Sequence, residues 1–479
     1  MKNKTQRIHL ILISLLTAAV FTVSASGCEN PQQASETGTT VSESTVDATT
    51  VEETTAKATT AIASKRLAES DISVTETINN SDDGSHAITA DGESADYSHV
   101  LVTKTGEADG DEADFYGENA ALFATNGGTL NLSNIVVKTD GTHANGVFSY
   151  GYGTTVNISD SYINTIGNCS GGLMTTGGGT MNASNLTIET SGNSSAAIRS
   201  DRGGGTVNVN GGYYATSGKG SPVIYSTADI TVSNAEMVST ASQGVVVEGK
   251  NSVTLNNVNL TADNNTKNSD KSNYYQAVMI YQSMSGDAAQ GLSSFTMNGG
   301  TLVNKNGDVF FVNNTATEIS LSNASITNEG DGVFLRAAAA GWGSEGSNGG
   351  QVNLNTSNQT INGDMLVDSI SKLNFYLKNN SDYIGAINPD GAEGEVYVEI
   401  ESGSTWTLTA DSYISSLTCD ANAIKLNGHK LYVDGKEYTE GSASTGSAIE
   451  ITVSSSSGGH EAPPDGNKPD GNPPAKPGS

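Results

Sequence analysis

Short runs of alternating apolar and polar residues recur along most of this chain. The run at 129–134 returns at 155, 180 and 206, and weaker copies begin at 229, 252, 294, 318 and 351. In every copy the second and fourth positions are apolar and the third is Asn, Thr or Ser, which is the two-residue period of a β-strand with one buried face. The third-position column reads Asn131, Asn157, Asn182, Asn208, Thr231, Thr254, Thr296, Ser320 and Asn353.

Two further strands are expected in each copy. The inward column of the second strand reads Val137, Ile163, Ile188, Tyr214, Met237, Leu260, Leu302 and Ile326. The third strand is a short apolar run, such as Val147-Phe148 or Leu173-Met174. The sequence does not decide which of the two adjacent residues faces inward. A repeat of this length with three strands is one coil of a β-solenoid. We therefore predict an all-β, single-stranded parallel β-helix with three strands per coil of about 24 residues over 66–453, with capping coils from about 370.

The corner between the first two strands carries Asn, Asp or Gly at the sixth position of most copies. These residues tolerate the left-handed backbone that a sharp corner requires. Buried asparagines stacked at these corners can also hydrogen-bond to one another. Glycines follow the second strand in turns such as Thr139-Asp140-Gly141 and Thr190-Ser191-Gly192.

The two ends of the chain have a different composition. Residues 1–27 have the basic start and short apolar stretch of a signal peptide, and Ala25-Ser26-Gly27-Cys28 is similar to a bacterial lipobox. We expect lipid on Cys28, with an ordinary cleaved signal peptide as the alternative. The Thr/Ser-rich residues 28–65 and the Pro/Gly-rich residues 454–479 are expected to be a disordered linker and a disordered tail.

The formal net charge is −29 at pH 7. Such an acidic surface repels nucleic acid and anionic lipid headgroups, and it suits solubility, a divalent cation such as calcium, or a cationic partner. Cys169 and Cys419 could pair, although two thiols so distant in sequence imply no disulfide framework.

Taken together, the repeated strand and corner resemble the right-handed parallel β-helix proteins of the pectin-lyase-like superfamily, especially adhesin-like surface proteins. The segment 404–409, which contains Trp406, followed by 411–414 is similar to the closing segment of autotransporter-type passengers. This resemblance covers about residues 85–440 and implies a lipid-tethered, adhesin-like protein on the extracellular side of a bacterial membrane. It specifies the fold more than the function, since the fold hosts lyases, hydrolases and binding proteins.

No catalytic residue is assigned from the sequence. The acidic run at 107–114 is interpreted as a solvated loop, and Arg199, which is followed closely by Asp201, as a surface ion pair rather than a catalytic pair. Insertions at roughly 263–275 and 337–350 interrupt the repeat, and they could be binding loops or disordered segments.

Binding is the leading functional hypothesis. Aromatic rings and an arginine on one face suit sugar rings or protein surfaces. The candidate ligand-binding residues lie in or just after the third strand, and they are Tyr150, Tyr152, Arg199, Tyr225 and Tyr281. The alternative is that these tyrosines only cover the turn. We expect an adhesin-like protein that binds a carbohydrate or a protein without catalysis and without a required cofactor. A polysaccharide lyase or glycoside hydrolase is the second hypothesis, and a structural envelope component is the third.

Overall fold

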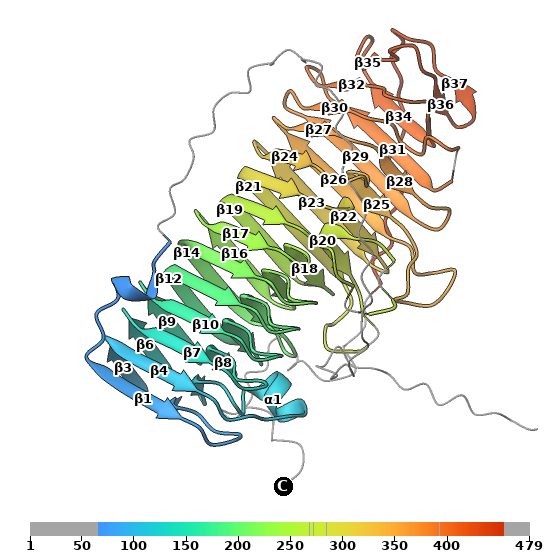
Figure 1. Ribbon diagram of the computed structural model, residues 1–479. Helices are drawn as coiled ribbons and strands as arrows, with labels where there is room; N and C mark the ends of the chain where they lie inside the picture. Colours follow the sequence, from blue (N-terminus) through green and yellow to red (C-terminus); the bar gives the residue numbers. More distant parts are fainter. Residues whose placement is uncertain (1–65, 268, 272, 284, 392, 455–479) are drawn as a thin grey trace, which may run out of the picture.

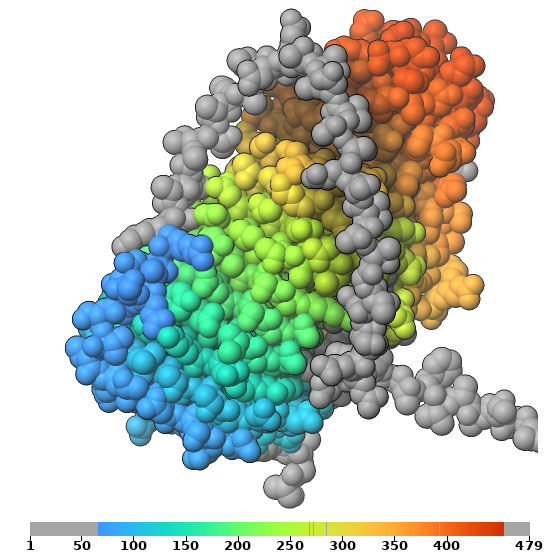
Figure 2. All heavy atoms as spheres, in the orientation of Figure 1, coloured from blue at the N-terminus to red at the C-terminus, as the bar shows by residue number. Residues whose placement is uncertain are grey.

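Parallel strands stack in register along the described chain (Figure 1). The computed structural model describes residues 66–454 except 268, 272, 284 and 392. The predicted signal peptide, Cys28, the linker to residue 65 and the tail from residue 455 lie outside the described residues. Within them the structure confirms the predicted parallel β-helix, and successive coils form successive bands along the axis in the space-filling view (Figure 2).

The first strands of the coils form one wall of the solenoid. They pair in parallel in the following order: β3 (Ser94–Ser98), β6 (Thr129–Ser133), β9 (Thr155–Ser159), β12 (Gly179–Thr190), β14 (Gly205–Thr216), β16 (Asp229–Ser233), β19 (Ser252–Ala262), β21 (Leu292–Asn304), β23 (Ala316–Ser322), β26 (Gln351–Ser357), β29 (Lys372–Lys378), β31 (Glu395–Ile400) and β34 (Ser416–Cys419).

The second strands pair beside them. Because β12, β14, β19 and β21 run through the corner, first and second strands share one 19-stranded sheet, which we call sheet A. The separate second strands are β1 (Glu76–Asn80), β4 (Val100–Lys104), β7 (Val136–Thr139), β10 (Tyr162–Thr165), β17 (Glu236–Ser239) and β24 (Ser325–Asn328).

The third strands form an 11-stranded sheet, which we call sheet B. In order they are β2 (Ile88–Asp91), β5 (Leu122–Thr125), β8 (Val147–Tyr150), β11 (Leu173–Thr176), β13 (Ile198–Ser200), β15 (Ile224–Ser226), β18 (Val245–Glu248), β20 (Gln276–Tyr281), β22 (Asp308–Asn313), β25 (Leu335–Ala337) and β28 (Met365–Val367).

Two small sheets complete the C-terminal end. One contains β27 (Thr360–Asn362), β30 (Asp382–Ile384), β32 (Thr405–Thr407) and β35 (Ile424–Lys425), and the other contains β33 (Ser412–Ile414), β36 (Leu431–Val433) and β37 (Lys436–Glu437). The described helices are the 3-10 turn η1 (Glu69–Asp71) and α1 (Asp111–Tyr116). No helix in the described part of the chain is long and apolar enough to cross a membrane.

The predicted core columns lie inside the coils. The second and fourth positions of the first strand are buried, as are the inward residues of the second strand except the half-buried Ile326. At the corners Asn134, Asp160, Asn185, Asn234 and Asn257 have φ between 50° and 57°, which confirms the left-handed corner. Several corner amides are hydrogen-bonded between coils, but these contacts are exposed rather than buried.

The last copy of the repeat is shifted from the predicted alignment. Ile319 pairs with Leu354 rather than Val352, because the strand that begins at Gln351 lies two residues further along. A shift of two residues leaves the same face inward, so an apolar alternation fixes the face but not the register.

The turn glycines are explained by the close approach of neighbouring coils. A Cβ on Gly192 would lie 1.8 Å from the carbonyl oxygen of Gly167, and one on Gly218 would lie 1.8 Å from that of Gly192. A side chain would therefore clash with the backbone of the preceding coil, which explains the recurrent Thr-x-Gly turn.

Cys419 is a free, buried thiol. It therefore forms no disulfide with Cys169, and the pairing that the sequence left open is not made.

Candidate functional site

The outward face of sheet B carries a column of side chains that the sequence could not assign. Val147, Leu173, Ile198 and their register partners belong to the main core, so the residues next to them point outward. The outward column reads Phe123, Phe148, Met174, Arg199, Tyr225, Val246, Met279, Phe311 and Arg336.

The candidate ligand-binding residues occupy this face, but they fall into separate groups. Arg199 is the direct register partner of Tyr225, and Tyr281 is the partner of Glu248. Tyr150 lies two coils before Arg199, and Tyr152 lies beyond the end of its strand with 47% of its surface exposed. The structure thus brings Arg199, Tyr225 and Tyr281 together and leaves the other two tyrosines apart.

Most of this face is covered rather than open. Tyr150 packs with Phe123, Phe148 and Met174 beside Tyr116 of α1. Tyr281 packs with Met279 and Phe311, and Trp342 contacts the Tyr281 ring at 5.1 Å between centroids. Residues of both sequence insertions, Tyr274 and Trp342, belong to the covering layer. The insertions therefore pack on sheet B, and the tyrosines do not form an exposed stripe.

Between the two apolar clusters lies a buried charged network. The Arg199 guanidinium donates to Asp201 at 2.9 Å and lies 3.9 Å from Asp114, and Nδ1 of His143 lies 3.3 Å from Asp114. All four residues are less than 8% exposed. The predicted surface ion pair is therefore wrong, because α1 covers it. The solvated-loop interpretation of 107–114 is also wrong in part, since Asp111–Tyr116 is helical and Asp114 is buried.

A second arginine ties α1 to the loop after β20. Arg202 donates to Asp287 at 2.5 Å and to Asp111 at 2.9 Å, and its guanidinium lies 3.5 Å from the centre of the Phe115 ring. Charge-assisted bonds of this kind are stronger than neutral ones. Arg199 and Arg202 therefore anchor the segments that cover sheet B.

Glu248 lies on the other side of the network. Its carboxylate accepts hydrogen bonds from the hydroxyls of Tyr225 and Tyr281, the second at 3.0 Å, and the two hydroxyls are 3.2 Å apart. Burial raises the pKa of Glu248 to about 7 and that of Asp201 to about 6, whereas burial and the Arg199 charge lower the pKa of His143 to about 4. A buried carboxyl with a pKa near neutrality can hold or release a proton at physiological pH.

Stability should therefore depend on pH through Glu248. Its folded pKa is raised above the ordinary value of 4.5, so its stabilising contribution is complete below that value and is lost as the pH rises through about 7. Raising the pH from 5 to 8 should cost about 2–3 kcal/mol through this group. Urea unfolding of the wild type and of Glu248→Gln at both pH values measures the contribution of Glu248. The contributions of His143 and Asp201 cancel in this comparison, because both proteins contain them.

Glu236→Gln is the matched control, since Glu236 is exposed on β17. The variant Glu248→Gln should gain stability over the wild type as the pH rises, and Glu236→Gln should not. An equal pH dependence in all three proteins would contradict the assignment.

Within the described residues, no group of three or more His, Cys, Asp or Glu side chains has an arrangement that could hold a metal ion.

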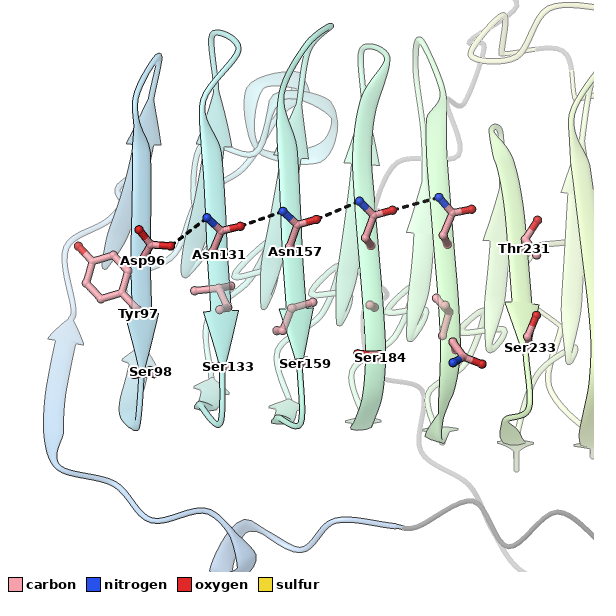
Figure 3. A pocket seen from close by; sticks show the side chains of 17 residues that line it. Asp96, Tyr97, Ser98, Asn131, Ser133, Asn157, Ser159, Ser184, Thr231 and Ser233 are labelled. Atoms are coloured by element: carbon pink, nitrogen blue, oxygen red, sulfur yellow. Dashed lines mark hydrogen bonds between the residues drawn. The ribbon is translucent and has the colours of Figure 1, made fainter.

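An open groove lies on the outward face of sheet A (Figure 3). It crosses the first strands from β3 to β16 and has a volume of about 660 Å³. Its floor is formed by outward-facing polar side chains in two columns. One column contains Asp96, Asn131, Asn157, Asn182, Asn208 and Thr231, and the other contains Ser98, Ser133, Ser159, Ser184, Asn210 and Ser233.

The amides of the first column form a continuous ladder. Asn131 donates to Asp96 at 2.9 Å and Asn157 donates to Asn131 at 2.8 Å; Asn182 and Asn208 continue the series at 3.0 Å each (Figure 3). A carboxamide has two N–H donors and two acceptor lone pairs. Within the ladder, Asn157 and Asn182 each use one donor and one lone pair, so one of each remains toward the groove.

This groove is not among the sites predicted from the sequence. The signal was present, because one amide-bearing residue type occupies the same register position in four adjacent coils. Comparisons with other proteins add no assignment: no protein-family model matches this chain, and no curated protein and no solved structure is significantly similar to it.

Proposed function

We propose that this protein is an exported, lipid-anchored, adhesin-like surface protein of pectin-lyase-like type that binds an extended polymer, carbohydrate or protein, in the sheet A groove without catalysis. The observation that carries the proposal is the amide ladder, which offers the same donor and acceptor in coil after coil along an open groove. A repeating polar row suits a ligand that itself repeats.

The outward face of sheet B is less accessible to a ligand than the groove on sheet A. Arg199, Tyr281 and Glu248 are almost entirely buried under α1 and the loops, so a ligand would have to displace a packed layer to reach them. The net charge of −29 favours neutral or cationic ligands over anionic ones.

The experiment is a retention assay with the purified full-length protein on immobilised polysaccharides and extended polypeptides, in which released reducing or unsaturated ends are also recorded. Retention without product is the expected result. If no polymer of either class is retained, the binding function fails and the structural-component hypothesis gains support.

The lipid anchor is a separate part of the proposal and rests on the residues before Cys28. Replacing Cys28 with Ala should move the protein from the membrane fraction to the soluble fraction of the producing cells. An unchanged distribution would indicate that the membrane attachment has another origin.

A second candidate function has one specific observation in its favour. Asp201 and Glu248 have raised pKa values and lie beside Arg199 and two tyrosines on one face, and paired carboxyls with shifted pKa values can act as general acid and base on glycans. Products in the assay above, lost in Glu248→Gln, would establish a polysaccharide-cleaving enzyme instead of a binding protein.

A further inference from the structure

We propose that the occupant of the sheet A groove is an extended polypeptide segment, held through its backbone by the Asn ladder. This inference rests on the proposed function and deepens it by selecting one class of polymer. The structure itself supplies the precedent, because segments of this chain already lie on the outward face of sheet A.

The C-terminal segment 446–453 crosses sheet A from β34 to β26. The hydroxyls of Ser416 and Thr418 accept hydrogen bonds from the backbone N–H groups of Ser447 and Gly446, respectively. The side-chain oxygen of Gln351 accepts one from the backbone N–H of Thr452. Ile449 and Ile451 are half-buried, whereas the residues between and beside them are exposed, as in an extended chain with one face on the protein.

The contact between Asn374 and Ile449 shows how an asparagine of a ladder can bind a peptide backbone. Asn374 donates to the backbone oxygen of Ile449 at 2.9 Å and accepts from the N–H of the same residue at 2.9 Å. At the same time Asn374 donates to Asn353 of the neighbouring coil at 2.9 Å. A laddered asparagine can therefore keep its contact with the next coil and bind a peptide group with its remaining donor and acceptor.

The asparagines of the ladder in the groove present the same groups. In an extended chain the N–H and C=O of one residue point to the same side, as in an antiparallel pair of strands. A carboxamide places its N–H and its oxygen side by side, so it can satisfy both. The groups of Asn157 and Asn182 that the ladder does not use face the groove in this way.

The opposite end of sheet A gives a second precedent. The N–H of Leu67 donates to the Thr187 hydroxyl at 2.8 Å, and Leu67 is buried. Arg66 lies over the Tyr213 ring at 4.3 Å, and Glu69 pairs with Lys138. The segment that precedes the first coil is thus also held by side chains of sheet A, and one of them, Thr187, binds its backbone.

The size of the groove sets the length of the segment. Its amide ladder, with Asp96, spans five adjacent strands, or about 19 Å at the spacing of a sheet, and an extended chain covers that distance in about six residues. Asp96 at one end and the acidic charge of the chain favour a segment with a basic residue.

The test uses fluorescent octapeptides and the purified full-length protein. One peptide has the sequence of residues 446–453, and the other has Lys in place of its Glu. Neutral β-linked oligosaccharides of similar length compete in a second series. Binding is followed by fluorescence anisotropy, and the Lys peptide should bind more tightly.

The decisive variant is Asn157→Thr with Asn182→Thr. Threonine occupies the same column in the three coils that follow the ladder, at Thr231, Thr254 and Thr296, so the fold accepts it at this position. Loss of the paired contacts should weaken peptide binding about tenfold or more. The control is Asn298→Ser, which lies on the same face outside the groove and matches Ser322 of the next coil.

The possible outcomes separate this inference from the proposed function. Weaker peptide binding in the double variant, with Asn298→Ser unchanged, supports the inference. Oligosaccharide binding without peptide binding overturns it but leaves the proposed function intact. Peptide binding that the double variant does not alter also overturns it, and no binding of either polymer overturns both.

Discussion

Replacing Arg199 with Ala should lower the free energy of unfolding by about 3–5 kcal/mol, because it leaves buried carboxylates without their cation. Arg199 is 6% exposed and bonds to Asp201 at 2.9 Å, with Asp114 at 3.9 Å. The substitution therefore removes the cation bonded to the buried Asp201 and lying close to the buried Asp114. Urea unfolding followed by far-UV circular dichroism at pH 7 gives the change.

The matched control is Lys305→Ala. Lys305 pairs with Glu329 at 2.6 Å, but both side chains are at least 40% exposed, so the loss should be below about 1 kcal/mol. Adding Asp201→Asn to Arg199→Ala should restore part of the stability, since it removes one of the stranded charges. An effect of Arg199→Ala no larger than that of Lys305→Ala would show that the network is solvated in solution.

Replacing Trp406 with Ala should cost about 3–5 kcal/mol as well, here by leaving a cavity. Trp406 is fully buried in β32, its indole N–H donates to the Gly385 oxygen at 2.9 Å, and its ring lies 5.6 Å from that of Tyr383. Because each coil of a solenoid contacts only its neighbours, the loss should appear first as early unfolding of the C-terminal coils.

Trp342→Ala provides the comparison, since the chain has two tryptophans. Trp342 is half-buried in a covering loop, against Tyr281, and its removal should cost roughly 1 kcal/mol. Urea unfolding by far-UV circular dichroism applies to both variants. A single unshifted transition in Trp406→Ala would mean that the C-terminal coils do not depend on this side chain.

The two long faces of the solenoid differ in what they offer a ligand. Sheet B carries the more reactive side chains, but two apolar clusters and the bonds of Arg199 and Arg202 hold its cover in place. Sheet A carries amides, hydroxyls and the Asp96 carboxylate along its groove, and these groups are open. The proposed binding function therefore rests on accessibility, and the alternative enzymatic function rests on reactivity.

Fold class, coil length, the inward columns of the first two strands and the left-handed corners followed from the sequence alone. They could be predicted because each depends on residues a few positions apart, through the period of two that a strand imposes and the backbone freedom of Asn and Gly. In addition, the same alternation recurs in nine copies, so an irregular residue in one copy did not obscure the pattern.

Everything that depends on which coils and loops meet was decided by the tertiary structure. The sequence could not orient the third strand, since adjacent residues such as Val147 and Phe148 are both apolar and both buried, one by the core and one by the cover. It could not place Asp114 beside Arg199, because those residues are 85 positions apart and meet only when α1 folds over sheet B. The recurring asparagines can be read from the sequence. Only the stacking of the coils brings their amides within hydrogen-bonding distance along a groove.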